Sequence, residues 1–168
     1  MKNSERGGRT PGWSRRQAGA AAVEFAFVFP ILFLLMYGTV VYSYVFVVQQ
    51  ALHYAAQEAA EAAVKVDPKV AGADALRTSN ARAAAVRALD WMPVGQRGRV
   101  VGNSGELVQV ALCTAGSANC APDSDAVTVT LRFEMFQPSP LFPVLSIFMV
   151  GSVPPLPERL VASATARV

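Results

Sequence analysis

The sequence predicts an α+β protein in which one long N-terminal helix crosses a membrane and leads into a small domain. That domain is expected to contain a second helix and an antiparallel sheet. The first observation is the composition, since 52% of the 168 residues are hydrophobic and only 16% are charged, against about 25% in a typical soluble domain. The second is the absence of Asp, Glu, Lys and Arg from residues 25–57. The third is the alternation of apolar and polar residues in several segments after Pro93, which is typical of strands.

The first 19 residues form a basic leader. Five basic residues lie there against the single acid Glu5: Lys2, Arg6, Arg9, Arg15 and Arg16. The net charge of +3 therefore belongs to this leader, and the rest of the chain is close to neutral. Because no basic face with interleaved aromatic residues remains, nucleic acid is not an expected partner.

Residues 26–48 are apolar except for Thr39, Ser43 and the tyrosines. A bilayer requires about 20 such residues in a helix, so this stretch predicts a single transmembrane helix. Pro30 and Gly38 lie within it, and both are tolerated better in spanning helices than in soluble ones. A cleaved secretory signal is the competing interpretation, but its apolar core is expected to be about 7–15 residues long and to end at a small-residue cleavage site.

The positive-inside rule fixes the expected orientation. Arg15 and Arg16 precede the apolar segment directly, so the leader is expected in the cytoplasm and the domain across the membrane. In a bacterium, the second compartment is the periplasm.

The spanning helix is expected to continue beyond the bilayer and to end near Asp67-Pro68, giving a helical region over residues 20–66. Apolar residues recur there at helical spacing, at Leu52, Ala55, Ala56, Ala59, Ala63 and Val66. Residues 73–91 predict a second helix, with Leu76, Ala83, Val86 and Leu89 on its apolar side.

The remaining chain predicts strands at residues 107–113, 126–136 and 160–168, each with one solvated face. The apolar run 141–150 is too short to cross a bilayer. It fits a buried strand, a short core helix or an element lying in the membrane interface. Together, residues 67–168 are expected to form a periplasmic α+β domain.

Cys113 and Cys120 are the only cysteines and close a short loop. On the oxidising side of the membrane they predict a disulfide, with a pair of free buried thiols as the alternative. A metal site is not expected, because two cysteines and the distant His53 do not supply four ligands. Asp123 and Asp125 are interpreted as solvated loop residues.

A single carboxylate, Glu24, lies at the front of the apolar segment, five residues after Gly19. An ionised carboxylate at this depth costs a few kcal/mol unless it is paired or reaches the headgroup layer. Five residues of helix span only about 7.5 Å, so Glu24 can also reach the interface without any partner.

The basic leader, the glycine, the glutamate and the long apolar helix resemble type IV prepilins. Residues 16–64 are most similar to the TadE-like pseudopilins of the tight-adherence (Tad, or Flp-type) pilus system. The resemblance implies a type IV pilin-like fold and cleavage by a prepilin peptidase between Gly19 and Ala20. Glu24 and Phe25 would then be the fifth and sixth mature residues and act in subunit assembly. Phe25 departs from the tyrosine that the Flp-type motif prefers.

The resemblance also implies a function, that of a minor pilin or pseudopilin in assembly of a Flp-type pilus. The expected partners are other pilin subunits through the N-terminal helix, the prepilin peptidase, the inner-membrane assembly platform and the lipid bilayer. The expected location is the bacterial inner membrane, with a single span. No cofactor or metal is expected.

Two other classes of function are compared with this one. The alternative to a pilin is an uncleaved single-pass anchor that presents a periplasmic binding or scaffolding domain to an envelope complex. An enzyme is not expected, because the sequence has no nucleophile elbow, no metal-ligand spacing and no glycine-rich phosphate loop.

Overall fold

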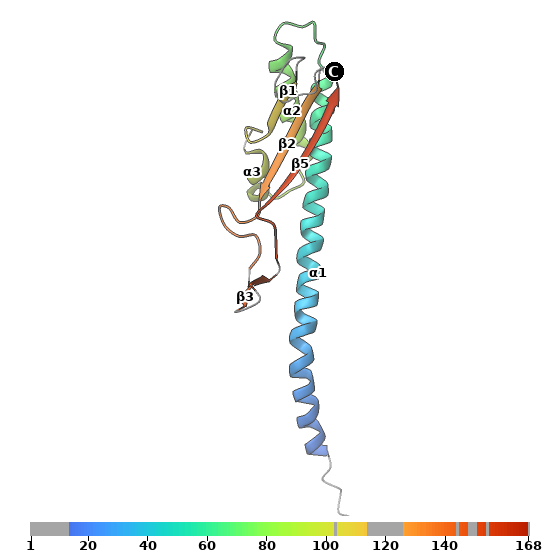
Figure 1. The fold of residues 1–168 in the computed structure, drawn as a ribbon, viewed down its shortest axis with the longest axis vertical. Coiled ribbons are helices and arrows are strands. Elements are labelled where there is room, and N and C mark those ends of the chain that lie inside the picture. The colour runs from blue at the N-terminus through green and yellow to red at the C-terminus, as the bar shows by residue number, and fades with distance from the viewer. Residues whose placement is uncertain are drawn as a thin grey trace, which may run out of the picture. The chain divides into compact units, whose positions relative to one another are not determined.

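The computed structural model describes residues 14–102, 104–113, 126–143, 145–147, 151–153 and 155–167 (Figure 1). The elements run in the order α1 (Ser14–Val64), α2 (Ala73–Ala88), α3 (Val94–Val101), β1 (Gln109–Cys113), β2 (Ala126–Glu134), β3 (Leu145–Ile147), β4 (Gly151–Val153) and β5 (Arg159–Arg167). The chain divides into two compact units, Met1–Val40 and Val41–Val168.

The first unit contains the N-terminal part of α1. The helix continues through Pro30, as expected for a proline in an apolar helix. From residue 19 to residue 33 every side chain is exposed, including Phe27, which is 74% exposed, and Leu35 beyond, at 65%. Burial therefore does not divide residues 19–33 of α1 into an inner and an outer face, and half-buried positions begin at Leu34.

The second unit contains the rest of α1, whose alanine-rich face forms part of the core. Leu52, Ala55, Ala56, Ala59 and Ala63 are each 0% exposed. They belong to one cluster with residues of α2, α3 and the sheet. The prediction of this face is confirmed. Small side chains allow other backbones to approach the helix closely, so α1 packs against the second helix and the sheet.

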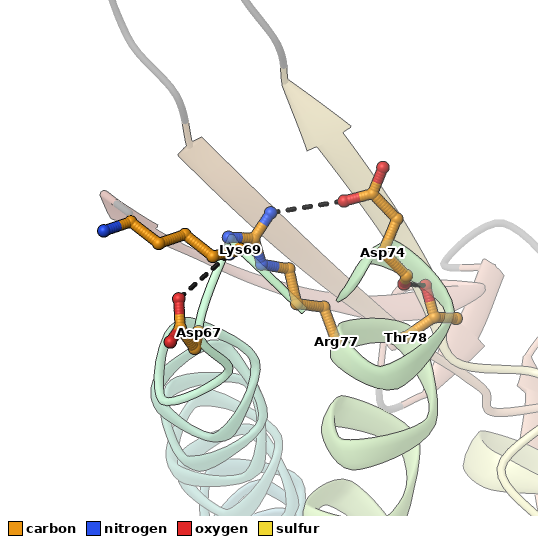
Figure 2. A network of polar contacts seen from close by, with 5 residues as sticks. All are labelled: Asp67, Lys69, Asp74, Arg77 and Thr78. Atoms are coloured by element: carbon orange, nitrogen blue, oxygen red, sulfur yellow. Dashed lines mark hydrogen bonds and ion pairs between the residues drawn. The ribbon is translucent and has the colours of Figure 1, made fainter. Parts of the chain in front are cut away.

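A short turn joins α1 to α2 (Figure 2). The Asp67 carboxylate accepts a hydrogen bond from the backbone N–H of Lys69 at 2.9 Å, and Gly72 adopts φ of 78° just before α2. A left-handed conformation of this kind favours glycine. At the start of α2, Arg77 donates to Asp74 across 3.2 Å.

The apolar side predicted for α2 is wrong at Leu76 and Ala83, whereas Val86 is half-buried against the core as expected. Leu76 is exposed and Ala83 is exposed, whereas Arg77, Ala81 and Ala85 are buried. Alanine occurs around much of this helix, so alanine positions carried little information about the buried direction and the single leucine was misleading. Leu89, just after the helix, is buried as expected.

The helix α3 was not predicted. Its sequence VGQRGRVV contains two glycines in eight residues, and glycine disfavours the interior of a helix by about 1 kcal/mol. Tertiary packing compensates, because Val100 and Val101 are completely buried against the core. Pro93 precedes the first helical residue, a position at which its missing N–H costs nothing.

Three antiparallel strands form the main sheet in the order β1-β2-β5. Val127, Val129, Leu131 and Phe133 point into the core from the central strand β2, and Leu160 and Ala162 do so from β5. The alternation seen in the sequence is thus confirmed for both strands. The helices and the sheet together make the predicted α+β layout.

A second, two-stranded sheet follows, in which β3 pairs antiparallel with β4. Only β3 lies within the apolar run 141–150, for which the sequence allows a strand, a short helix or an interfacial element; β4 follows directly after the run. Residues 145–147 form a strand, while Leu141 and Phe142 are half-buried against the core. Residues 148–150 lie outside the described part of the chain.

Candidate processing and assembly site

The predicted processing residues lie in the first turns of α1. Gly19 and Ala20 are exposed and helical, and Gly19 comes five residues after Ser14, the first residue of the helix. A side chain at Gly19 would meet no heavy atom of the described residues within 4 Å. The backbone of Arg15 and Arg16 is helical as well; their side chains lie outside the description.

Glu24 and Phe25 follow one turn later, and both are exposed. Ala20 and Glu24 are four residues apart, which puts them on the same side of the helix and about 6 Å apart along its axis. The structure therefore brings Ala20, the predicted N-terminus after cleavage, and the only carboxylate of this segment onto one face.

An aromatic row continues from this site, which the sequence interpretation missed. The ring centroids of Phe25 and Phe29 are 5.3 Å apart, those of Phe29 and Phe33 are 6.2 Å apart, and those of Phe33 and Tyr37 are 6.3 Å apart. These distances fall in the range of favourable aromatic pairs. The signal was present in the sequence, because these residues recur every four positions.

The surface of this segment resembles the lipid-facing or helix-facing side of a membrane protein. Exposed large apolar residues line it without a polar face. Among the described residues, one helix is long and apolar enough to cross a membrane, within Gly19–Val64, with a mean hydropathy of 2.2 in its most apolar stretch. So large an apolar surface marks a site of contact with lipid or with other proteins.

Polar contacts join the adjacent part of α1 to the domain in the second unit. The Tyr42 hydroxyl donates to the carbonyl of Pro155 at 3.1 Å, and Gln49 donates to the carbonyl of Val161 at 3.1 Å. The Tyr44 hydroxyl donates to the side-chain oxygen of Gln96. These contacts join residues that are far apart in the sequence, so no local sequence pattern predicts them.

No candidate catalytic centre emerges from the residues that the structure describes. His53 is exposed and lies 3.0 Å from the amide nitrogen of Gln49, in agreement with its interpretation as a surface helix residue. Within the described ranges, no three His, Cys, Asp or Glu side chains gather as metal ligands.

The titratable groups beside the histidine are those of an ordinary helix surface. A hydrogen bond to Glu58 raises the pKa of Tyr54, and the charge of Glu58 adds to this effect. Tyr54 and Glu58 line a small cavity of about 240 Å³ together with Ala84, Arg87 and Ala88. This set contains no nucleophile paired with a base.

Of the two cysteines, Cys113 is the last residue of β1 and is paired in register with Ala126 of β2. Cys120 lies outside the described residues, as do Asp123 and Asp125. The predicted disulfide therefore stays a prediction.

These features define a class: proteins with one helix long and apolar enough to anchor them in a membrane, followed by a small α+β domain. Residues 19–61 match the model of a family described as TadE-like protein, which confirms the resemblance over that segment. The family match implies a protein associated with the Tad pilus. No curated protein and no solved structure matches the chain.

Proposed function

We propose that the protein is a minor pilin or pseudopilin that acts in assembly of a Tad pilus. A prepilin peptidase cleaves it after Gly19, and its single span holds it in the inner membrane with the leader in the cytoplasm and residues 67–168 in the periplasm. The observation that carries the proposal is the family match over residues 19–61, which covers the exposed glycine, the lone carboxylate and the apolar helix.

The leader acts as an anchor in this proposal. Arg15 and Arg16 keep the N-terminus at the cytoplasmic face, because moving an arginine through the hydrocarbon costs several kcal/mol. Cleavage after Gly19 removes both charges. The subunit is then free to leave the bilayer and enter a filament.

Cleavage requires that the scissile bond leave the helix. Gly19 lies within the first two turns of α1, where helix ends fray because their first N–H groups lack helical partners. Glycine itself weakens a helix by about 1 kcal/mol relative to alanine. The position and the residue type both make local unwinding inexpensive.

Cleavage also creates a new charge. The α-ammonium of Ala20 and the carboxylate of Glu24 from a neighbouring subunit neutralise one another among packed apolar helices. Neither ion then has to be buried without a partner, which would cost several kcal/mol. The exposed apolar surface of α1 provides the contact with neighbouring subunits and with the assembly platform.

Processing is tested by co-expression of the full chain with and without a prepilin peptidase, followed by N-terminal sequencing. We expect a mature chain that starts at Ala20 only when the peptidase is present. Gly19→Leu should block the cut, while Gly38→Leu should not. The two glycines are matched at the Cβ position, since neither has a described heavy atom within 4 Å of an added Cβ, and circular dichroism of both variants checks that the helix is retained.

An intact leader on protein recovered with pili would refute processing. It would favour instead the uncleaved single-pass anchor that presents its domain to another envelope complex.

Assembly is tested with Glu24→Ala in a piliated strain. We expect normal cleavage after Gly19 but loss of piliation, because the buried ammonium of Ala20 then lacks its partner. Glu61→Ala is the control, since Glu61 is an exposed carboxylate on the same helix within the same family match. Unchanged piliation with Glu24→Ala would contradict the proposed role.

A further inference from the structure

Residues 135–157 form a second apolar segment, distant in sequence from the spanning helix. This stretch of 23 residues contains no Asp, Glu, Lys or Arg, although about six would be expected at typical composition. It includes the β3–β4 hairpin. Met135 lies in the domain core, and Leu141, Phe142 and Leu156 pack against that core. The uncharged β3–β4 hairpin between these packed ends suits an apolar environment.

Both ends of the hairpin are fixed to α1 inside its apolar segment. Before β3, the rings of Phe142 and Tyr44 meet edge to face, with centroids 5.2 Å apart. After β4, the carbonyl of Pro155 accepts the hydrogen bond from the hydroxyl of Tyr42 at 3.1 Å.

The base of the hairpin must lie near the level of these two tyrosines. Leu145 is three residues after Phe142, and Val153 is two residues before Pro155. Extended chains of these lengths reach at most about 11 Å and 7 Å.

The length of the apolar helix gives the depth of Tyr42 relative to the end of the membrane-spanning stretch. The apolar residues 26–48 make a helix about 34 Å long, close to the hydrocarbon thickness of about 30 Å. Tyr42 lies six residues before the end of that stretch, and thus about 9 Å inside it. Tyrosines are enriched near the membrane–water interface, which is consistent with Tyr42 close to the end of the span.

An apolar groove opens at the same level. It has a volume of about 660 Å³ and is lined mainly by Tyr42, Val45, Phe46, Val47 and Leu160. Phe46 and Val47 remain at least half exposed. The groove lies in the second unit.

The backbone of the segment also suits a membrane boundary. Six of its 23 residues are prolines, which have no N–H to leave unsatisfied, and the β3–β4 ladder pairs further backbone groups. Fewer unpaired donors lower the cost of entering an environment without water.

We infer that the β3–β4 hairpin is a second membrane-binding element, inserted at the boundary between headgroups and acyl chains of the outer leaflet of the inner membrane. Lipid acyl chains occupy the groove beside Tyr42 and Phe46. The expected depth agrees with the 5–10 Å typical of interfacial elements. The inference rests on the membrane span of the proposed function.

Fluorescence quenching by lipids with brominated acyl chains tests this inference on the full chain in phospholipid vesicles. Trp13→Phe and Trp91→Phe give a background without tryptophan. Ile147→Trp then places the probe in β3, and Ser152→Trp places an independent probe in β4 should the first variant fold poorly. We expect a blue-shifted emission and a clear loss of fluorescence in brominated vesicles for both.

Two reference probes separate the inference from the proposed function. Phe33→Trp reports on the span and should be quenched, while Val70→Trp, in the turn after α1, should not. Quenching of neither hairpin probe while Phe33→Trp is quenched would overturn the inference alone. An unquenched Phe33→Trp would overturn the membrane span, and the inference with it. A hairpin probe whose emission responds to protein concentration but not to bromine would assign the surface to a second copy of the chain, which also overturns the inference.

Discussion

Gly105 allows the turn before β1 to approach α2 closely, and Gly105→Ala should destabilise the domain strongly. Its φ is +80°, and an added Cβ would lie 2.9 Å from Cβ of Arg82, 3.2 Å from the Arg82 carbonyl oxygen and 3.3 Å from Val86. The left-handed conformation costs an alanine about 1–2 kcal/mol, and the steric overlap adds about 1–3 kcal/mol.

Part of this cost is offset, because alanine restricts the unfolded chain by about 0.4–1 kcal/mol relative to glycine. The expected net loss in the free energy of unfolding is about 2–4 kcal/mol. For a unit of this size it corresponds to a fall in Tm of roughly 10 °C. Thermal unfolding of the full chain in detergent, followed by circular dichroism, measures it.

Gly95→Ala is the matched control. Gly95 lies in α3, and no described heavy atom would lie within 4 Å of its added Cβ, so this variant should be unchanged or stabilised by up to about 1 kcal/mol. Gly105→Asn separates the two causes, because asparagine tolerates the left-handed conformation but keeps the overlap. A Tm for Gly105→Ala equal to that of Gly95→Ala would refute the reasoning.

Three further predictions concern the stability of the domain, two for core residues and one for the loop between Cys113 and Cys120. Arg77→Met should leave the domain as stable or stabilise it by about 1–3 kcal/mol, since the buried Nε and Nη2 of Arg77 lack hydrogen-bond partners; a loss seen by urea unfolding would argue against this. Phe133→Ala should cost about 3–5 kcal/mol because Phe133 is completely buried, whereas exposed Arg132→Ala should cost little by the same assay. If Cys113 and Cys120 are bridged as proposed, a reductant should lower stability by about 2–3 kcal/mol in the wild type and not in the double serine variant.

The sequence predicted those parts of the fold in which side-chain size and polarity change regularly. Leu52 and the alanines after it recur at helical spacing between polar residues, so the buried face of α1 followed directly. Val129 and its neighbours alternate with polar residues in β2 for the same reason. In α2 the alanines are more evenly spread, and the buried position of Arg77 contradicts its polarity.

Other features depend on contacts that no local pattern encodes. The glycines of α3 disfavour a helix, and only the burial of Val100 and Val101 explains why one forms. Tyr42 and Pro155 are separated by 113 positions, so their hydrogen bond requires the fold. The candidate site differs, because Gly19 and Glu24 lie within two turns of one helix and their spacing is legible directly from the sequence.

The two parts of α1 differ in the size and the burial of their side chains. Residues after Val48 that face the core are mostly alanines, which bring the α2 and sheet backbones close and bury little area each. Most of the large apolar residues between Val23 and Val40 are exposed, so the domain itself does not bury the apolar area that they offer. Only lipid or another polypeptide can supply that contact. The sequence therefore divides one continuous helix into a segment that packs within its own domain and a segment whose apolar surface is available to lipid or to another polypeptide.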